Sequence, residues 1–86
     1  MRKNKIIVVD DESNLLEVFK RLLDELGYFP ILCNDGDTAF KQFLANQDTD
    51  LIISDLRMPG LSGIDLLKKV KEISPETEFI IMTGFG

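Results

Sequence analysis

Histidine is absent from these 86 residues, and cysteine occurs only once, as Cys33. Without histidine the chain can build neither a Ser-His-Asp nor a Cys-His catalytic site, nor any metal centre with a histidine ligand. A single cysteine cannot form an internal disulfide, and Cys33 lies in the apolar segment FPILC, so we expect a small buried core residue. Any chemistry must therefore use carboxylates, hydroxyls, lysines or the backbone.

Long apolar runs and an excess of positive charge are missing as well. No run approaches the roughly 20 residues that span a bilayer, and the apolar stretch after the basic start MRKNK is too short for a signal peptide. A net charge of -5 argues against gripping nucleic acid by neutralising phosphates. We expect one small soluble domain over residues 1–86, located in the cytoplasm, with no membrane or direct nucleic-acid partner.

What the chain does have is a regular alternation of short apolar runs and helical patterns. The apolar runs are too short for helices and predict buried strands, whereas apolar residues spaced three and four apart predict amphipathic helices. Pro30 in the second run favours a strand at the edge of the sheet. Strands are predicted at 6–9, 29–33, 51–54 and 78–82, and helices around 15–26, 39–44 and 64–70. The order βαβαβαβ predicts an α/β fold, a doubly wound parallel sheet with helices on both faces.

Three of the four predicted strands are followed by side chains that can do chemistry. Asp10 and Asp11 follow the first strand, Asp55 the third and Thr83 the fourth. Parallel strands end at one edge of the sheet, so these groups are expected to meet there. Three carboxylates in one pocket repel each other unless a cation neutralises them, and Mg²⁺ prefers such oxygen ligands.

Each of these residues also has an ordinary structural explanation. Asp11, taken alone, is more often the N-cap of the following helix than a metal ligand. Asp55 alone is a common kind of residue at the exit of a strand, and Thr83 alone could simply end one. The prediction of a metal site therefore rests on the three strand ends together.

The segments IIVVDDE, LIISDLRMPGLSGIDLL and FIIMTGFG resemble three successive signatures of the receiver domain of two-component response regulators. The resemblance implies a flavodoxin-like fold, Mg²⁺ as cofactor and Asp55 as the phosphoacceptor for a sensor kinase phosphohistidine. Asp11 matches a direct metal ligand and Asp10 an acidic neighbour that acts largely through water. The set is completed by the backbone carbonyl of Arg57 as a metal ligand, Thr83 as the switch hydroxyl, and Pro59 and Gly63 as loop-shaping residues.

The resemblance also implies parts that follow the fourth strand in the family: a fifth strand with a lysine, and two further helices. We expect the chain to be the N-terminal portion of such a domain, whose open fourth strand favours a homo-oligomer or a segment-exchanged dimer. The motifs RMPG and MTGFG are most similar to those of receivers in nitrogen-regulation-type transcriptional activators.

Two functions stay open at this point. One is a phosphoacceptor switch that phosphorylates itself at Asp55 rather than turning over a free substrate. The other is a non-catalytic interaction module that retains the metal pocket. A phosphohydrolase is less favoured, because such enzymes usually have a second acid soon after the nucleophile and DLRMPG has none.

Overall fold

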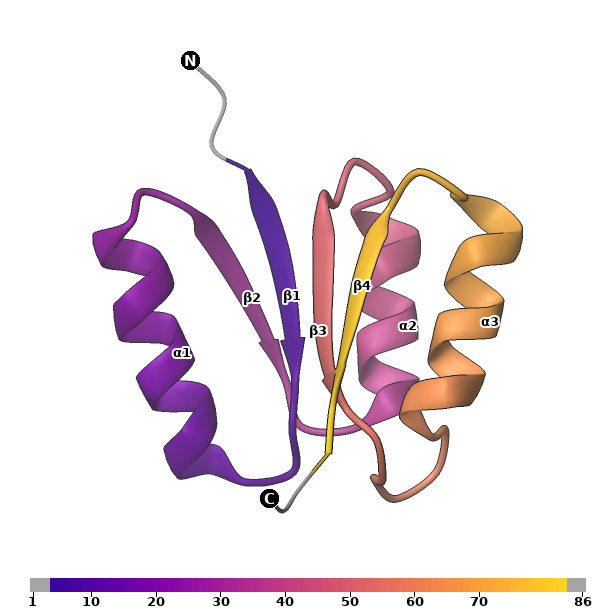
Figure 1. Cartoon of the computed structure of the whole chain (residues 1–86), viewed down its shortest axis with the longest axis horizontal. Helices are drawn as coiled ribbons and strands as arrows, with labels where there is room; N and C mark the ends of the chain where they lie inside the picture. Colours follow the sequence, from indigo (N-terminus) through magenta and orange to yellow (C-terminus); the bar gives the residue numbers. More distant parts are fainter. Residues whose placement is uncertain (1–3, 84–86) are drawn as a thin grey trace.

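The computed structural model describes residues 4–83, and over that range it contains four strands and three helices (Figure 1). Their types and order agree with the sequence predictions. Within the described range, no helix combines the length and apolar character needed to cross a membrane. The elements are β1 (Lys5–Val9), α1 (Ser13–Glu25), β2 (Phe29–Cys33), α2 (Gly36–Ala45), β3 (Leu51–Asp55), α3 (Gly63–Ile73) and β4 (Glu78–Met82).

The four strands form one parallel sheet in the order β2-β1-β3-β4. The predicted fold class is thus confirmed, and β2, which contains Pro30, lies at an edge as expected. The chain runs from β1 outward to β2 and then returns past β1 to β3. This reversal places the topological switch point between the carboxyl ends of β1 and β3, the place where parallel sheets usually bind ligands.

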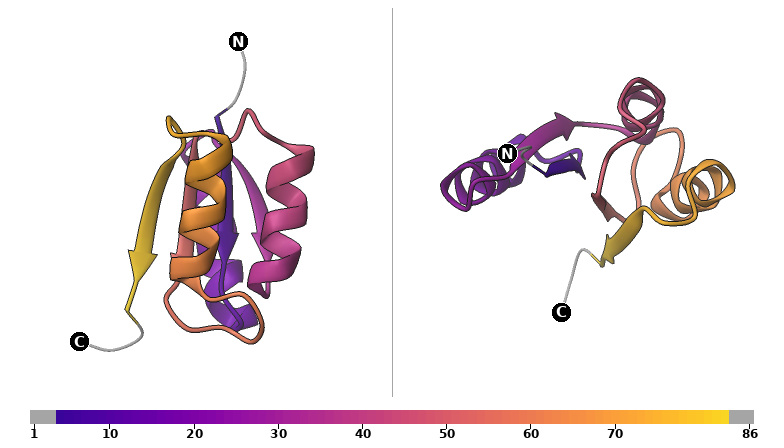
Figure 2. Two further views of the ribbon diagram at one scale, coloured as in Figure 1. Left: turned by 90° about the vertical axis from the view of Figure 1, so that its right-hand side faces the viewer. Right: turned by 90° about the horizontal axis from the view of Figure 1, so that it is seen from above.

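Helices cover the two faces of the sheet unequally, with α1 on one face and α2 and α3 on the other (Figure 2, right). Beneath α1, the buried side chains of Leu16 and Leu23 pack against Ile6 and Val8 of β1. The larger core lies under α2 and α3, where the other sides of β1 and β3 meet the helices. Its buried members include Ile7, Val9, Cys33, Phe43, Ile52, Leu66 and Val70.

Local sequence explains most of the helix ends. The Asp35 carboxylate caps α2 by accepting a hydrogen bond from the Thr38 N–H (2.7 Å), and Ser62 Oγ caps α3 by accepting from the Asp65 N–H (3.2 Å). Gly27 follows α1 with a φ of 87°, a left-handed conformation that favours glycine. The N-cap position of α1 is Glu12, without a side-chain cap hydrogen bond. Asp11 is therefore not the cap of this helix.

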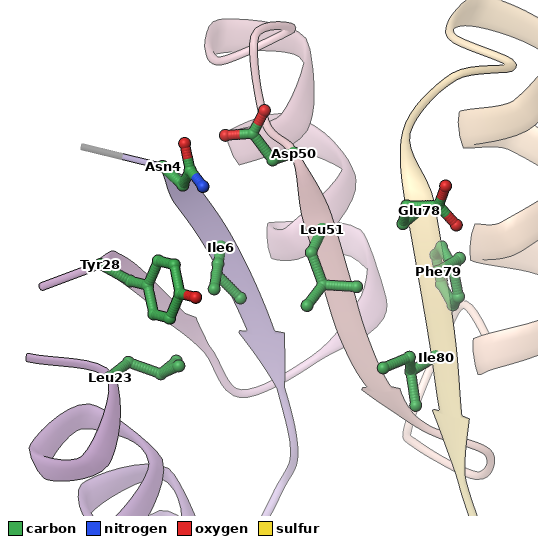
Figure 3. A pocket seen from close by; sticks show the side chains of 9 residues that line it. All are labelled: Asn4, Ile6, Leu23, Tyr28, Asp50, Leu51, Glu78, Phe79 and Ile80. Atoms are coloured by element: carbon green, nitrogen blue, oxygen red, sulfur yellow. The ribbon is translucent and has the colours of Figure 1, made fainter. Parts of the chain in front are cut away.

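On the α1 face, part of the sheet is left open and forms an apolar hollow of about 530 Å³ (Figure 3). Leu23 of α1 borders it on one side and Ile80 of β4 on the other, with Ile6 and Leu51 between them. Asn4, Asp50 and Glu78 mark its upper end, at the beginnings of the strands. This hollow therefore lies away from the acids that follow the strands.

Candidate functional site

Asp10, Asp11 and Asp55 come together at the carboxyl ends of β1 and β3. One carboxylate oxygen from each residue lies within 4.8 Å of the others. The register of the sheet explains this, because Val9 at the end of β1 pairs with Ser54 of β3, so the residues that follow both lie at the same edge. The structure thus brings these three side chains together, as the sequence predicted.

Asp10 is the buried member of this cluster, with 4% of its surface exposed. Its Oδ1 accepts a hydrogen bond from the Glu12 N–H at 2.9 Å, which fixes the turn between β1 and α1. Burial raises the pKa of Asp10 above its ordinary value, and the nearby negative charges of Asp55 and Asp11 raise it further, while the Glu12 N–H lowers it. Within residues 4–83, no positively charged side chain is among the causes that act on the pKa of Asp10.

The three carboxylates line a pocket of about 320 Å³. Asp11 is exposed and Asp55 is half-buried. Thr83, directly after β4, lines the same pocket. All four of the predicted side-chain groups from three strand ends thus share one cavity, although the last three residues of the FIIMTGFG segment lie outside the described range.

The loop after β3 carries the remaining predicted residues. Its base is closed by a hydrogen bond from the Gly63 N–H to the Leu56 carbonyl at 3.0 Å. A Cβ at position 63 would overlap the Asp55 carbonyl oxygen, so only glycine allows this close approach. Arg57 and Pro59 lie in the loop and are exposed. The metal role of the Arg57 carbonyl and the shaping role of Pro59 stay predictions.

The donor set suits a hard divalent ion. Carboxylate oxygens are what Mg²⁺ prefers, and its ligands lie about 2.1 Å from it, so opposite ligands are about 4 Å apart. The spacing of the three carboxylate oxygens, within 4.8 Å of one another, is close to that value. A cation here would also offset the repulsion and burial that raise the pKa of Asp10. The residues therefore fit Mg²⁺, with Asp10, Asp11 and Asp55 as its candidate ligands.

Sequence reasoning missed some residues around this pocket. Glu12, Leu15 and Met82 also line it. Leu15 belongs to the helix predicted around 15–26, and the spacing of its apolar residues does not distinguish a core residue from a pocket wall. Glu12 follows the two aspartates directly, so its place at the rim could have been expected from adjacency alone.

Comparison with known proteins gives a consistent picture. The sequence model described as "Response regulator receiver domain" matches residues 6–86. The chain belongs to this family. Chemotaxis protein CheY1 of Helicobacter pylori is 39% identical over 85 residues, which cover 95% of this chain and 68% of CheY1.

Solved structures agree with the family assignment. A receiver domain protein from Clostridium thermocellum superposes with a TM-score of 0.90 and 38% identity, covering 96% of this chain and 67% of that one. A chain of the complex between histidine kinase ThkA and response regulator protein TrrA gives a TM-score of 0.87 at 34% identity, covering 96% and 71%. The chain thus spans about two thirds of the length of CheY1 and of these two solved chains.

Proposed function

We propose that this receiver accepts a phosphoryl group from the phosphohistidine of a sensor kinase or phosphotransfer protein onto Asp55. Mg²⁺ would be held by Asp10, Asp11, Asp55 and the backbone carbonyl of Arg57. The observation that carries the proposal is the gathering of the three carboxylates within 4.8 Å at the switch point of the sheet. The similar chain in the complex of histidine kinase ThkA with response regulator protein TrrA supports a histidine kinase as the class of partner.

In the proposed reaction an Asp55 carboxylate oxygen attacks the phosphorus in line, an oxygen–phosphorus bond forms, and the bond from phosphorus to the histidine nitrogen breaks. The electron pair stays on the departing imidazole, which takes up a proton from solvent. A bound Mg²⁺ supplies charge neutralisation for the phosphoryl oxygens. Asp55 suits the role of nucleophile because it is half-buried but faces the cavity, whereas Asp10 is buried and held by the Glu12 N–H.

Thr83 would report the modification. Its place on the wall of the same pocket allows its hydroxyl to donate a hydrogen bond to a phosphoryl oxygen on Asp55. Movement of Thr83 toward that oxygen would alter the surface at the end of β4 and so change affinity for partners. A cytoplasmic location and an output in transcription regulation belong to this proposal, the second supported by the motif wording.

A non-catalytic interaction or oligomerisation module with an intact metal pocket is the second candidate. The open α1 face and the uncovered edge of β4 favour it. So does the composition of the acid pocket, since no lysine is among the described residues that line it. Self-association as a homo-oligomer or a segment-exchanged dimer is part of this candidate.

Intact-mass measurement after incubation with acetyl phosphate or phosphoramidate distinguishes the two candidates. The phosphoacceptor proposal predicts one phosphoryl adduct on the native chain, dependent on Mg²⁺ and absent from Asp55→Asn. Asp65→Asn, which removes an equal charge from an exposed position, serves as the control and should be labelled like the native chain. An equal adduct on the native chain and Asp55→Asn, or none on either, contradicts the phosphoacceptor proposal.

A further inference from the structure

The tip of the loop after β3 is held by a side chain that lies far from it in the sequence. Asp37, in the first turn of α2, points its Oδ2 at this loop and accepts a hydrogen bond from the Leu61 N–H at 3.4 Å. The same oxygen lies so close to Gly60 that a Cβ there would overlap it. Gly60 also has a φ of 75°, so both its conformation and this contact favour glycine.

A second contact joins the same two segments. Gly36, the first residue of α2, lies against the Leu61 carbonyl, and a Cβ at position 36 would overlap that oxygen. Leu61 and Met58 also pack against the buried core. The loop is thus closed at its base by the Gly63–Leu56 hydrogen bond and held at its tip by the start of α2. Arg57 lies between these two attachments.

We propose that Asp37 is a positioning residue for the metal site, acting through the Gly60–Leu61 peptide on the loop that presents the Arg57 carbonyl. The inference rests on the proposed role of that carbonyl. A loop that is fixed at its base and at its tip keeps the Arg57 carbonyl oriented before the ion binds. Less of the loop then has to become ordered on binding. Asp37 is not among the described residues that line the acid pocket, and it is exposed, so its replacement leaves the core intact.

The test uses Asp37→Ala, which removes the acceptor, and Asp37→Asn, which keeps an acceptor oxygen without the charge. Mg²⁺ affinity is measured by isothermal titration calorimetry without any phosphodonor. We expect the dissociation constant to rise about threefold to tenfold in Asp37→Ala, somewhat less than for partners that touch a ligand directly. Asp37→Asn should stay near the native value. Asp65→Ala is the matched control, because it removes an exposed first-turn acid from α3 and should change nothing.

Two further readouts separate positioning from a general effect on stability. In the metal-free chain, ¹⁵N order parameters of residues 57, 58, 60 and 61 should fall in Asp37→Ala and recover in Asp37→Asn. In labelling by acetyl phosphate, the Mg²⁺ concentration for half-maximal rate should rise in Asp37→Ala while the rate at saturating Mg²⁺ stays native.

The inference fails if Asp37→Ala lowers the urea midpoint but leaves Mg²⁺ affinity and loop order unchanged, or if Asp65→Ala has the same effect. It also fails if Asp37→Asn is as weak as Asp37→Ala, because charge rather than the loop contact would then be responsible. Loss of Mg²⁺ affinity in Asp37→Ala together with no labelling of the native chain would instead support Asp37 and contradict the phosphoacceptor proposal.

Discussion

At the scale of single residues, burial controls the reactivity of the Cys33 thiol. Burial raises the pKa of the Cys33 thiol to about 11, with a smaller effect from Asp35. Because the thiolate is the reactive form, we predict that a disulfide reagent at mildly alkaline pH modifies the native chain very slowly. The same reagent should react at once in urea. Rapid stoichiometric reaction of the native chain would contradict the burial of this side chain.

Asp35 shows the opposite shift. The Thr38 N–H donates a hydrogen bond to its carboxylate and lowers the pKa below the ordinary value of 3.8. The charged cap therefore stabilises the folded chain above pH 3.8, and this contribution disappears as the pH falls through the lower pKa of the folded state. Asp35→Asn keeps a neutral cap that does not titrate.

We accordingly predict that urea midpoints of the native chain and Asp35→Asn differ more at neutral pH than in strong acid. The native chain should be the more stable of the two at neutral pH. A difference that stays constant across the acid range would show that the cap does not depend on its charge.

Some features of the acid pocket were predictable from the sequence and others were not. The sequence predicted that Asp10, Asp11, Asp55 and Thr83 lie together because each lies at or just after the end of a parallel strand, and all four line one pocket. The division between a buried Asp10 and an exposed Asp11 was not predictable, since it depends on the turn that the Glu12 N–H fixes. The Asp37 contact was equally hidden, because it joins segments 24 positions apart through tertiary packing.

At the scale of elements, packing against the sheet stabilises α3. Leu66 is fully buried in the larger core, whereas Leu44 near the end of α2 is 45% exposed. We predict that Leu66→Ala lowers the free energy of unfolding by about 2–5 kcal/mol, because it leaves a cavity. Leu44→Ala makes the same chemical change in another helix and should cost about 0.5 kcal/mol. Similar costs in urea denaturation would mean that α3 does not pack as described.

Element types were predictable and element starts were less so. The apolar periods identified every strand and helix of the described range, but the second helix was predicted around 39–44, whereas α2 begins at Gly36. A glycine and an aspartate have weak helix propensity, and the Asp35 cap together with contact to the loop overrides it.

At the scale of the whole molecule, β4 is the edge strand of the sheet formed by residues 4–83. The Glu78 N–H and the Met82 carbonyl are both hydrogen-bonded toward β3, so by alternation Phe79 and Ile81 direct their backbone groups outward. Ile80 is 50% exposed beside the hollow of Figure 3. Unpaired edge groups next to apolar surface favour pairing with a second copy.

We therefore predict concentration-dependent self-association in sedimentation velocity, reduced by Ile80→Lys. Ile73→Lys is the matched control, because Ile73 is 43% exposed at the end of α3, away from that edge. A native chain that sediments as a monomer at every concentration would contradict this, as would equal effects of the two substitutions.

The central claim is that acids from the ends of β1 and β3 share one ion. Its most direct test is calorimetric titration of Mg²⁺ into the native chain, Asp11→Asn, Asp55→Asn and the control Asp65→Asn. We predict one ion per native chain and per control chain. Loss of either ligand should weaken binding by at least about tenfold, since even outer partners of metal ligands cost that much. Unchanged affinity in both Asp11→Asn and Asp55→Asn, or no binding to the native chain, would contradict the account.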